Sequence, residues 1–193
     1  MVLPKTHEIL IADIGVSDLN VLIDGLDPAI ETWICDGDEG DDPLSMLREA
    51  LTTDGVSRIH LLGPGDPGRL SIGDALIDTQ TVREYFLELS EAPGARQCEI
   101  AVWGSNVALG TSGSTFIRTL AECTGAVVAA SSKPLGTVDG NGRWTLDVIV
   151  RPRVPFKRAQ LAAFAGSLSL GRYPEKLSDS PNEELAEIDA FPV

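Results

Sequence analysis

Short apolar runs separated by amphipathic segments constrain the fold of this chain more than any other feature. Residues 8–14 read Glu-Ile-Leu-Ile-Ala-Asp-Ile, with almost no polar alternation. A run of this length and composition is typical of a strand that is buried on both faces, as in a parallel sheet. Similar runs recur at a spacing of about 25–30 residues, with helical periodicity between them, which predicts βαβ units and a mainly parallel sheet.

Six strands and five helices follow from the positions of these runs. The predicted strands cover residues 8–14, 31–36, 57–62, 99–103, 126–130 and 144–150, with a short edge hairpin at 69–77. The predicted helices cover residues 16–26, 43–51, 79–90, 111–123 and 157–170. Ser17 and Asp42 are the expected N-caps of the first two helices, and Pro43 stands at a first helical position. The sequence therefore predicts a three-layer α/β fold, with a mostly parallel six-stranded sheet and helices on both faces.

The length of 193 residues suits one domain and is short for two. Residues 1–152 are expected to form the α/β domain. The composition changes after Pro155, so residues 153–193 are interpreted as a C-terminal helix followed by an acidic tail. From Gly171 onward this tail is expected to be poorly ordered or to pack along the surface.

The charge balance excludes some classes of partner. The chain has 29 acidic and 15 basic residues, a net charge of −14. Such a surface repels nucleic-acid phosphates and anionic lipids, so neither is expected as a main partner. Residues 36–42 form an acidic turn whose oxygens suit calcium. Leu47 stands where the EF-hand pattern needs a glutamate, so a solvated acidic turn is the preferred interpretation and a calcium loop stays open.

Cysteine and histidine usage predicts neither a metal site nor a cofactor. The three cysteines show no CxxC spacing, and the chain has only two histidines. No run approaches the roughly 18 apolar residues of a membrane helix, so no membrane insertion is expected. The N-terminus shows no signal-peptide pattern. A soluble chain is expected, either cytoplasmic or exported by a route without such a signal.

Two segments carry a family resemblance. The first, residues 59–68, contains Leu62-Gly63-Pro64-Gly65-Asp66, and the second, residues 103–110, begins Trp103-Gly104-Ser105-Asn106. With the spacing that follows to residue 131, they resemble a bacterial domain found at the head of large exported, repeat-containing, adhesin-like proteins. That domain is similar to the caspase-type cysteine peptidases, which include caspases, gingipains and legumains. The resemblance covers residues 8–150 and implies a caspase-like sheet.

The resemblance also implies where catalytic groups would stand. Such domains usually carry Ser-His-Gly-Ser-Pro-Gly after the third strand and Gly-Cys-Asn-Val-Ala after the fourth. The histidine would be the base and the cysteine the nucleophile. In this sequence the two positions are Pro64 and Ser105. A proline cannot act as a base, and a serine depends on a base even more than a cysteine does. His60 lies about four residues upstream inside a strand, at roughly 13 Å, so it is interpreted as a buried core histidine.

A pocket can survive the loss of catalysis. The carboxyl ends of parallel strands gather ligand sites, so the loops after Leu62 and Trp103 are expected to lie side by side. The candidate pocket residues are Asp13, Asp36, Gly65, Gly104 and Asn106. The resemblance implies that Asp13 could line a pocket for a basic residue. The competing interpretation is that it caps the following helix or bonds to loop amides.

Three functions follow from these observations. The first is a catalytically inactive, caspase-like domain that serves as a binding or assembly module for a protein or peptide partner. The second is a self-associating structural subunit, which would make the protein a homo-oligomer. The third is a hydrolase that uses Ser105 with an unrecognised base.

Overall fold

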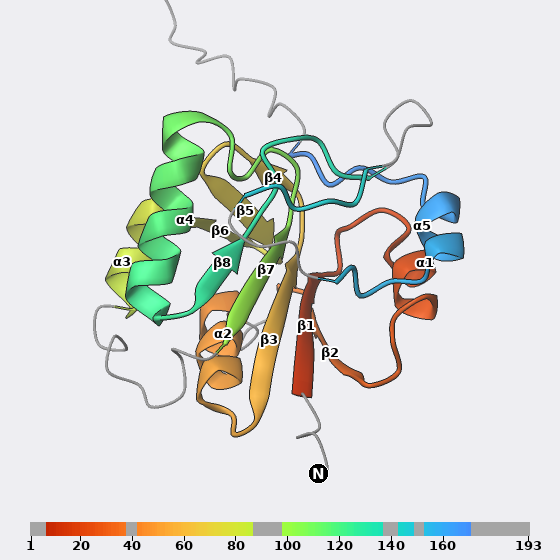
Figure 1. Cartoon of the computed structure of the whole chain (residues 1–193), viewed down its shortest axis with the longest axis horizontal. Helices are drawn as coiled ribbons and strands as arrows, with labels where there is room; N and C mark the ends of the chain where they lie inside the picture. Colours follow the sequence, from red (N-terminus) through yellow and green to blue (C-terminus); the bar gives the residue numbers. More distant parts are fainter. Residues whose placement is uncertain (1–6, 38–41, 87–97, 137–142, 149–152, 171–193) are drawn as a thin grey trace, which may run out of the picture.

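The computed structural model describes residues 7–37, 42–86, 98–136, 143–148 and 153–170. Its centre is a five-stranded, all-parallel sheet of order β2-β1-β3-β7-β8 (Figure 1). The strands are β1 (His7–Asp13), β2 (Ile30–Cys35), β3 (Val56–Leu62), β7 (Glu99–Trp103) and β8 (Val127–Ala129). The predicted α/β fold with a mostly parallel central sheet is confirmed, and its strands have the apolar runs from which they were predicted.

A small antiparallel sheet follows β3. It consists of β4 (Gly65–Asp66), β5 (Arg69–Ile72) and β6 (Ala75–Asp78) in that order. The hairpin predicted at 69–77 is therefore confirmed. Its first strand begins directly after Pro64, so the small sheet is joined to the carboxyl edge of the large one.

Helices cover both faces of the central sheet. They are α1 (Leu19–Asp24), α2 (Pro43–Thr52), α3 (Thr79–Phe86), α4 (Gly110–Thr124) and α5 (Arg158–Ala163). Figure 1 shows α2, α3 and α4 on one side of the strands and the short α1 and α5 on the other. The predicted cap of α2 is confirmed, because the Asp42 carboxylate accepts hydrogen bonds from Leu44 N and Ser45 N.

Each face has its own buried cluster. The first cluster joins Ile9, Ile59, Leu61, Ile100 and Val102 of the strands to apolar residues of α2, α3 and α4. The second cluster joins Leu10, Leu62, Ala101 and Trp103 to side chains of α1 and of the later segments, among them Leu135, Trp144, Leu146, Phe156, Phe164 and Leu168. Residues 153–170 thus contribute to the core of the large sheet.

The sixth predicted strand, 144–150, is not a strand over its described residues. Trp144 and Leu146 are buried while their neighbours are exposed, which is the alternation that the sequence showed. Residues 143–148 make only single bridges, from Arg143 to Gly136 and from Val148 to Ala130. The alternation reports one-sided burial of an irregular segment against the second cluster, and it does not require a ladder of backbone bonds. Residues 149–150 lie outside the described residues.

Two predicted helices are shorter than expected. The first was predicted over residues 16–26 and covers Leu19–Asp24. Its N-cap is Asp18 in a left-handed conformation, so Ser17 is not the cap. The last ends at Ala163, and Phe164 to Leu170 are not helical. Apolar spacing alone predicted a helix to residue 170, but backbone bonds to distant loops hold this segment extended. The tail from 171 lies outside the described residues.

Candidate functional site

The loops after β3 and β7 lie side by side at the carboxyl edge of the sheet, as predicted. Leu62 and Trp103 are paired in register, and Gly63 N donates to Trp103 O at 3.3 Å. A Cβ on Gly65 would lie 2.5 Å from Val107 Cγ2 and 2.9 Å from Ser105 O. Only glycine at position 65 therefore lets the two loops approach this closely. Gly65, Gly104 and Ser105 are brought together by this packing.

The Ser105 hydroxyl is fully engaged with the backbone of Leu135. It donates to Leu135 O at 3.2 Å and accepts from Leu135 N at 2.9 Å. The side chain is completely buried. A nucleophilic serine needs an accessible oxygen and a base that takes its proton, and here the proton points to a carbonyl. Ser105 therefore fastens the segment around Leu135 to the loop after β7.

Two backbone amides of these loops converge on one carbonyl oxygen. Gly65 N and Ser105 N each donate to Leu168 O at 2.8 Å, and Leu170 N donates back to Gly65 O at 2.9 Å. We call Gly65 N and Ser105 N the amide clamp. A pair of preorganised N–H groups on one oxygen is the arrangement that also binds the oxyanion in acyl-transfer enzymes. Sequence reasoning missed Leu168, although Gly166 inside the predicted helix was a signal against helix.

Pro64 and Asn106 shape the two loops. Pro64 is half-buried, and its carbonyl accepts from Ser71 N at 2.9 Å, which joins the loop to β5. Asn106 has a left-handed backbone with φ of 60°, a conformation that asparagine tolerates. Its N–H donates to Lys133 O at 3.1 Å. Neither residue supplies a proton acceptor to the Ser105 hydroxyl, which is bonded to Leu135. Pro64, the position at which the resemblance implies a base, therefore serves loop structure.

Asp13 is bound to loop amides. Its Oδ1 accepts from Gly15 N at 2.9 Å and from Gly73 N at 3.2 Å, and the side chain is buried. Burial raises the pKa of Asp13, and the two amide bonds oppose this rise. Of the two interpretations of this residue, the contacts match the one with loop amides. It joins β1 to the turn between β5 and β6.

The acidic turn is described only in part. Asp36 is exposed at the end of β2, and Asp42 caps α2. Residues 38–41 lie outside the described residues, so the calcium loop that the sequence left open at 36–42 stays a prediction. In the part of the chain that the structure describes, no group of three or more His, Cys, Asp or Glu side chains is placed to hold a metal ion.

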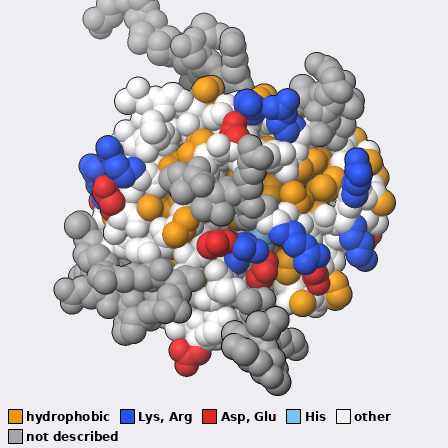
Figure 2. Space-filling view, viewed as in Figure 1, with side chains coloured by type: hydrophobic (Ala, Val, Ile, Leu, Met, Phe, Trp, Pro, Cys, Tyr) orange, Lys and Arg blue, Asp and Glu red, His pale blue; other side chains and the backbone are white. Residues whose placement is uncertain are grey.

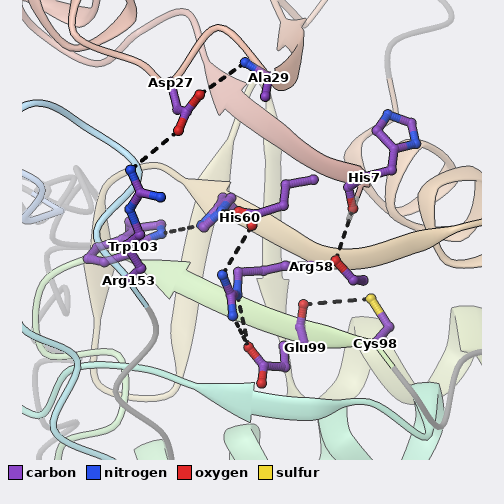
Figure 3. A network of polar contacts seen from close by, with 11 residues as sticks. His7, Asp27, Ala29, Arg58, His60, Cys98, Glu99, Trp103 and Arg153 are labelled. Atoms are coloured by element: carbon purple, nitrogen blue, oxygen red, sulfur yellow. Dashed lines mark hydrogen bonds and ion pairs between the residues drawn. The ribbon is translucent and has the colours of Figure 1, made fainter. Parts of the chain in front are cut away.

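A polar network crosses the middle of the sheet on the side of the second cluster (Figure 3). Glu8, Arg58 and Glu99 are in register on β1, β3 and β7. Arg58 Nη1 lies 3.3 Å from Glu8 Oε1, and Arg58 Nη2 lies 2.6 Å from Glu99 Oε2. We call these three residues with His60 and Trp103 the polar row. Figure 2 shows acidic and basic side chains gathered beside a histidine below the centre of this face.

His60 is buried at the inner end of the polar row, as predicted. Trp103 Nε1 donates to His60 Nδ1 at 3.0 Å, so the proton of the neutral ring is on Nε2, which lies 3.0 Å from Glu8 Oε2. The pKa of His60 is lowered, chiefly by burial, while the hydrogen bond to Glu8 and the charge of Glu8 oppose this shift. The hydrogen bond from His60 and the charge of Arg58 lower the pKa of Glu8, against the opposing effect of burial. His60 is thus a structural donor held in one tautomer.

A shallow pocket adjoins the polar row. It is lined by Glu8, Asp27, Ala29, Ile30, Arg153 and Pro155. Arg153 Nη2 lies 3.4 Å from Asp27 Oδ2, as the dashed line in Figure 3 marks. Sequence reasoning missed Glu8, Arg58 and Glu99. The signal was the alternation of Arg58 and His60 with Ile59 and Leu61 along the predicted strand 57–62.

The fold and the site together define a class of protein: an α/β domain whose parallel sheet presents an amide clamp at its carboxyl edge. The family model described as "Domain of unknown function (DUF4347)" matches residues 9–168, and the chain belongs to that family. The matched range extends to Leu168, whose carbonyl occupies the clamp. No curated protein matches this chain significantly. Within the described residues, no helix is long and apolar enough to span a membrane.

Proposed function

We propose that this chain is a catalytically inactive relative of the caspase-type peptidases that binds an extended peptide at the carboxyl edge of its sheet. The observation that carries the proposal is the combination of the amide clamp with the tied hydroxyl of Ser105. Gly65 N and Ser105 N are aimed at a peptide carbonyl, while the Ser105 hydroxyl is held by Leu135. The arrangement therefore keeps the two amides that bind a peptide carbonyl and lacks a free hydroxyl that could attack it.

The chemistry of the missing base supports the same proposal. The two histidines of the chain are His7 and His60. His60 is bonded through both ring nitrogens, to Glu8 and to Trp103, and His7 Nε2 lies 2.9 Å from Glu31 on the opposite end of β1 from the clamp. A hydrolase that uses Ser105 would need another acceptor and a different orientation of the hydroxyl. The geometry therefore favours the binding module over the hydrolase.

The resemblance to domains at the head of large exported bacterial proteins extends the proposal to an assembly role. In that setting, the bound peptide would be part of a protein partner or of a neighbouring segment of the same protein. The net charge of −14 favours a partner surface with basic residues around the peptide.

The test is a hydrolysis screen against a mixed peptide library and an ester substrate, together with a fluorophosphonate probe for activated serines. We expect no turnover and no labelling of the native chain. The variants are Ser105→Ala and, as a matched control, Ser131→Ala, which removes another fully buried serine hydroxyl. Turnover that is lost in Ser105→Ala and kept in Ser131→Ala would show that the chain is an enzyme and would overturn the proposal.

A further inference from the structure

We infer that the amide clamp belongs to a peptide site that reads the pattern Phe-x-Gly-x-Leu, and that residues 164–168 of this chain are its tethered ligand. The inference rests on the proposed function and names the ligand of that same site. The expected partner in trans is an extended peptide with the same pattern, which enters when the tethered segment leaves.

The backbone of the segment is bound as an added strand. Leu168 O accepts from both clamp amides, and Leu170 N donates to Gly65 O. Ser169 forms a parallel bridge with Gly65, and Ser167 forms an antiparallel bridge with Gly136. The segment is therefore paired on two sides by loops that are far from it in sequence. Peptide recognition by strand addition uses such main-chain bonds for affinity and alternate side chains for specificity.

The side chains of the segment alternate as that mode requires. Phe164, Gly166 and Leu168 are buried, while Ala165 and Ser167 are exposed. The Phe164 ring packs edge-on against Trp144, with ring centroids 5.4 Å apart. Leu168 is completely buried in the second cluster. The first and fifth positions of the pattern are thus apolar anchors, and the exposed positions place no constraint on the residue.

The third position accepts only glycine. A Cβ on Gly166 would lie 2.4 Å from Ser17 O and 2.7 Å from the Phe164 ring. Ser17 O is a backbone atom that cannot swing aside, so a side chain at this position must displace the segment. Gly136 faces it with φ of +90°, and a Cβ there would lie 3.0 Å from Gly166 O. The site therefore selects a peptide in two ways. Its third position has no room for a side chain, and its first and fifth positions bury apolar side chains.

The way in which the segment is attached supports a tethered ligand. It follows α5, which has no buried side chain. Tethering gives a segment an effective concentration on the order of millimolar, so a weak intramolecular ligand can fill its site and hide it from a free peptide. A change that weakens only the tethered copy should then expose the site.

The experiment measures the binding of a fluorescent peptide, residues 164–170, to the full chain by anisotropy. The proteins are the native chain, Gly166→Ala, and Gly73→Ala as a matched control. A Cβ on Gly73 would lie 2.7 Å from Cys35 Sγ, so this control introduces a similar clash in the turn between β5 and β6, away from the clamp. We expect Gly166→Ala to bind the peptide at least about tenfold more tightly than the native chain and the control. The same peptide with alanine in place of its glycine should not bind.

Equal binding of the peptide to all three proteins, or no binding to a folded Gly166→Ala, would overturn the inference. If Gly166→Ala does not fold, hydrogen exchange of the native chain decides. The amides of Gly65 and Ser105 should exchange well before those of Ile59 and Ile100, because release of the segment frees them without unfolding the sheet. Exchange of all four only by global unfolding would overturn it. Neither result bears on hydrolysis, so a failure here leaves the proposed absence of catalysis intact.

Discussion

The face of the central sheet that α2, α3 and α4 cover is mostly apolar, with Asp13 at its carboxyl edge, whereas the opposite face carries the polar row. The same strands build both. On β3, Ile59 and Leu61 point into the first cluster, while Arg58 and His60 belong to the other face. Arg58 and Glu8 keep 22% and 23% of their side-chain surface exposed, so solvent reaches the outer end of the row.

This difference shows how one sheet can have a rigid face, covered by α2, α3 and α4, and an adaptable face, which carries the polar row. Three helices exclude water from the first face, so a charge there would be unpaired and costly. On the second face, α1 and α5 are short, and irregular segments such as 164–170 complete the cover. The face that is built from loops and tethered segments is the one that carries the polar row and ends at the amide clamp. Binding sites are drawn from parts of a fold that can open at low cost.

The largest expected effect comes from a cavity in the first face. Phe116→Ala should lower the free energy of unfolding by about 3–5 kcal/mol, because Phe116 is completely buried in the first cluster. Leu161→Ala, on the short helix α5 of the second face, should cost less than about 1.5 kcal/mol, because Leu161 is only partly buried where it packs against the second cluster. Urea denaturation at neutral pH measures both. Similar costs for the two variants would mean that the faces are equally rigid.

The polar row should contribute a smaller amount. Arg58→Met leaves Glu8 and Glu99 facing each other without their cation, and should cost about 1–2 kcal/mol, since the row is partly solvated. The matched control is Arg118→Met, because Arg118 Nε lies 3.9 Å from Glu122 in a largely exposed pair. That control should change stability by less than about 0.5 kcal/mol. If both arginines matter equally, the row is a surface feature rather than part of the core.

Acid should weaken the second face before the first. The pKa of His60 is lowered in the fold, so its contribution is complete above the unfolded value near 6.5 and is lost as the pH falls through that value toward the folded pKa. The pKa of Glu8 is also lowered in the fold, so the stability that Glu8 contributes is lost at lower pH, below its ordinary pKa of 4.5. The raised pKa of Asp13 acts in the opposite sense, because its proton is bound more tightly in the fold.

The measurement for this pH dependence is the urea midpoint between pH 7.5 and 5.5 in a His7→Asn background, which leaves His60 as the remaining histidine. The free energy of unfolding should fall by at most about 1.4 kcal/mol per pH unit. The slope should disappear in His60→Gln, which cannot gain a proton in this range. A slope that persists in His60→Gln would assign the effect to other groups.

The smallest signal should come from the thiol of Cys98, at the edge of the first cluster. Burial raises its pKa to about 11, and the residue is 2% exposed. We expect no reaction of Cys98 with a thiol reagent in the native chain at pH 8, and reaction in urea, since the thiolate is the reactive form. Mass spectrometry of the labelled peptides gives the site. Rapid native labelling of Cys98 would show that the first face opens as readily as the second.

The sequence by itself determined the parallel sheet, the capped start of α2, the burial of His60 and the presence of proline and serine at positions 64 and 105. These features depend on local patterns: apolar runs, a cap residue beside a proline, and the identity of single side chains. Such patterns report burial and backbone preference wherever the segment is placed.

Only the tertiary structure decided the features that depend on contacts between residues far apart in the sequence. The periodicity of 157–170 favours a helix, yet Phe164 to Leu170 are not helical. Gly65 and Ser105, about 60 to 100 residues earlier, supply backbone bonds to Leu168 and Leu170 instead. The alternation of 144–148 reports burial without a ladder, and Arg58 and Glu99 became an ion pair only when β3 and β7 paired. A hydrogen bond needs both of its partners in place, and folding alone brings together partners that the sequence holds far apart.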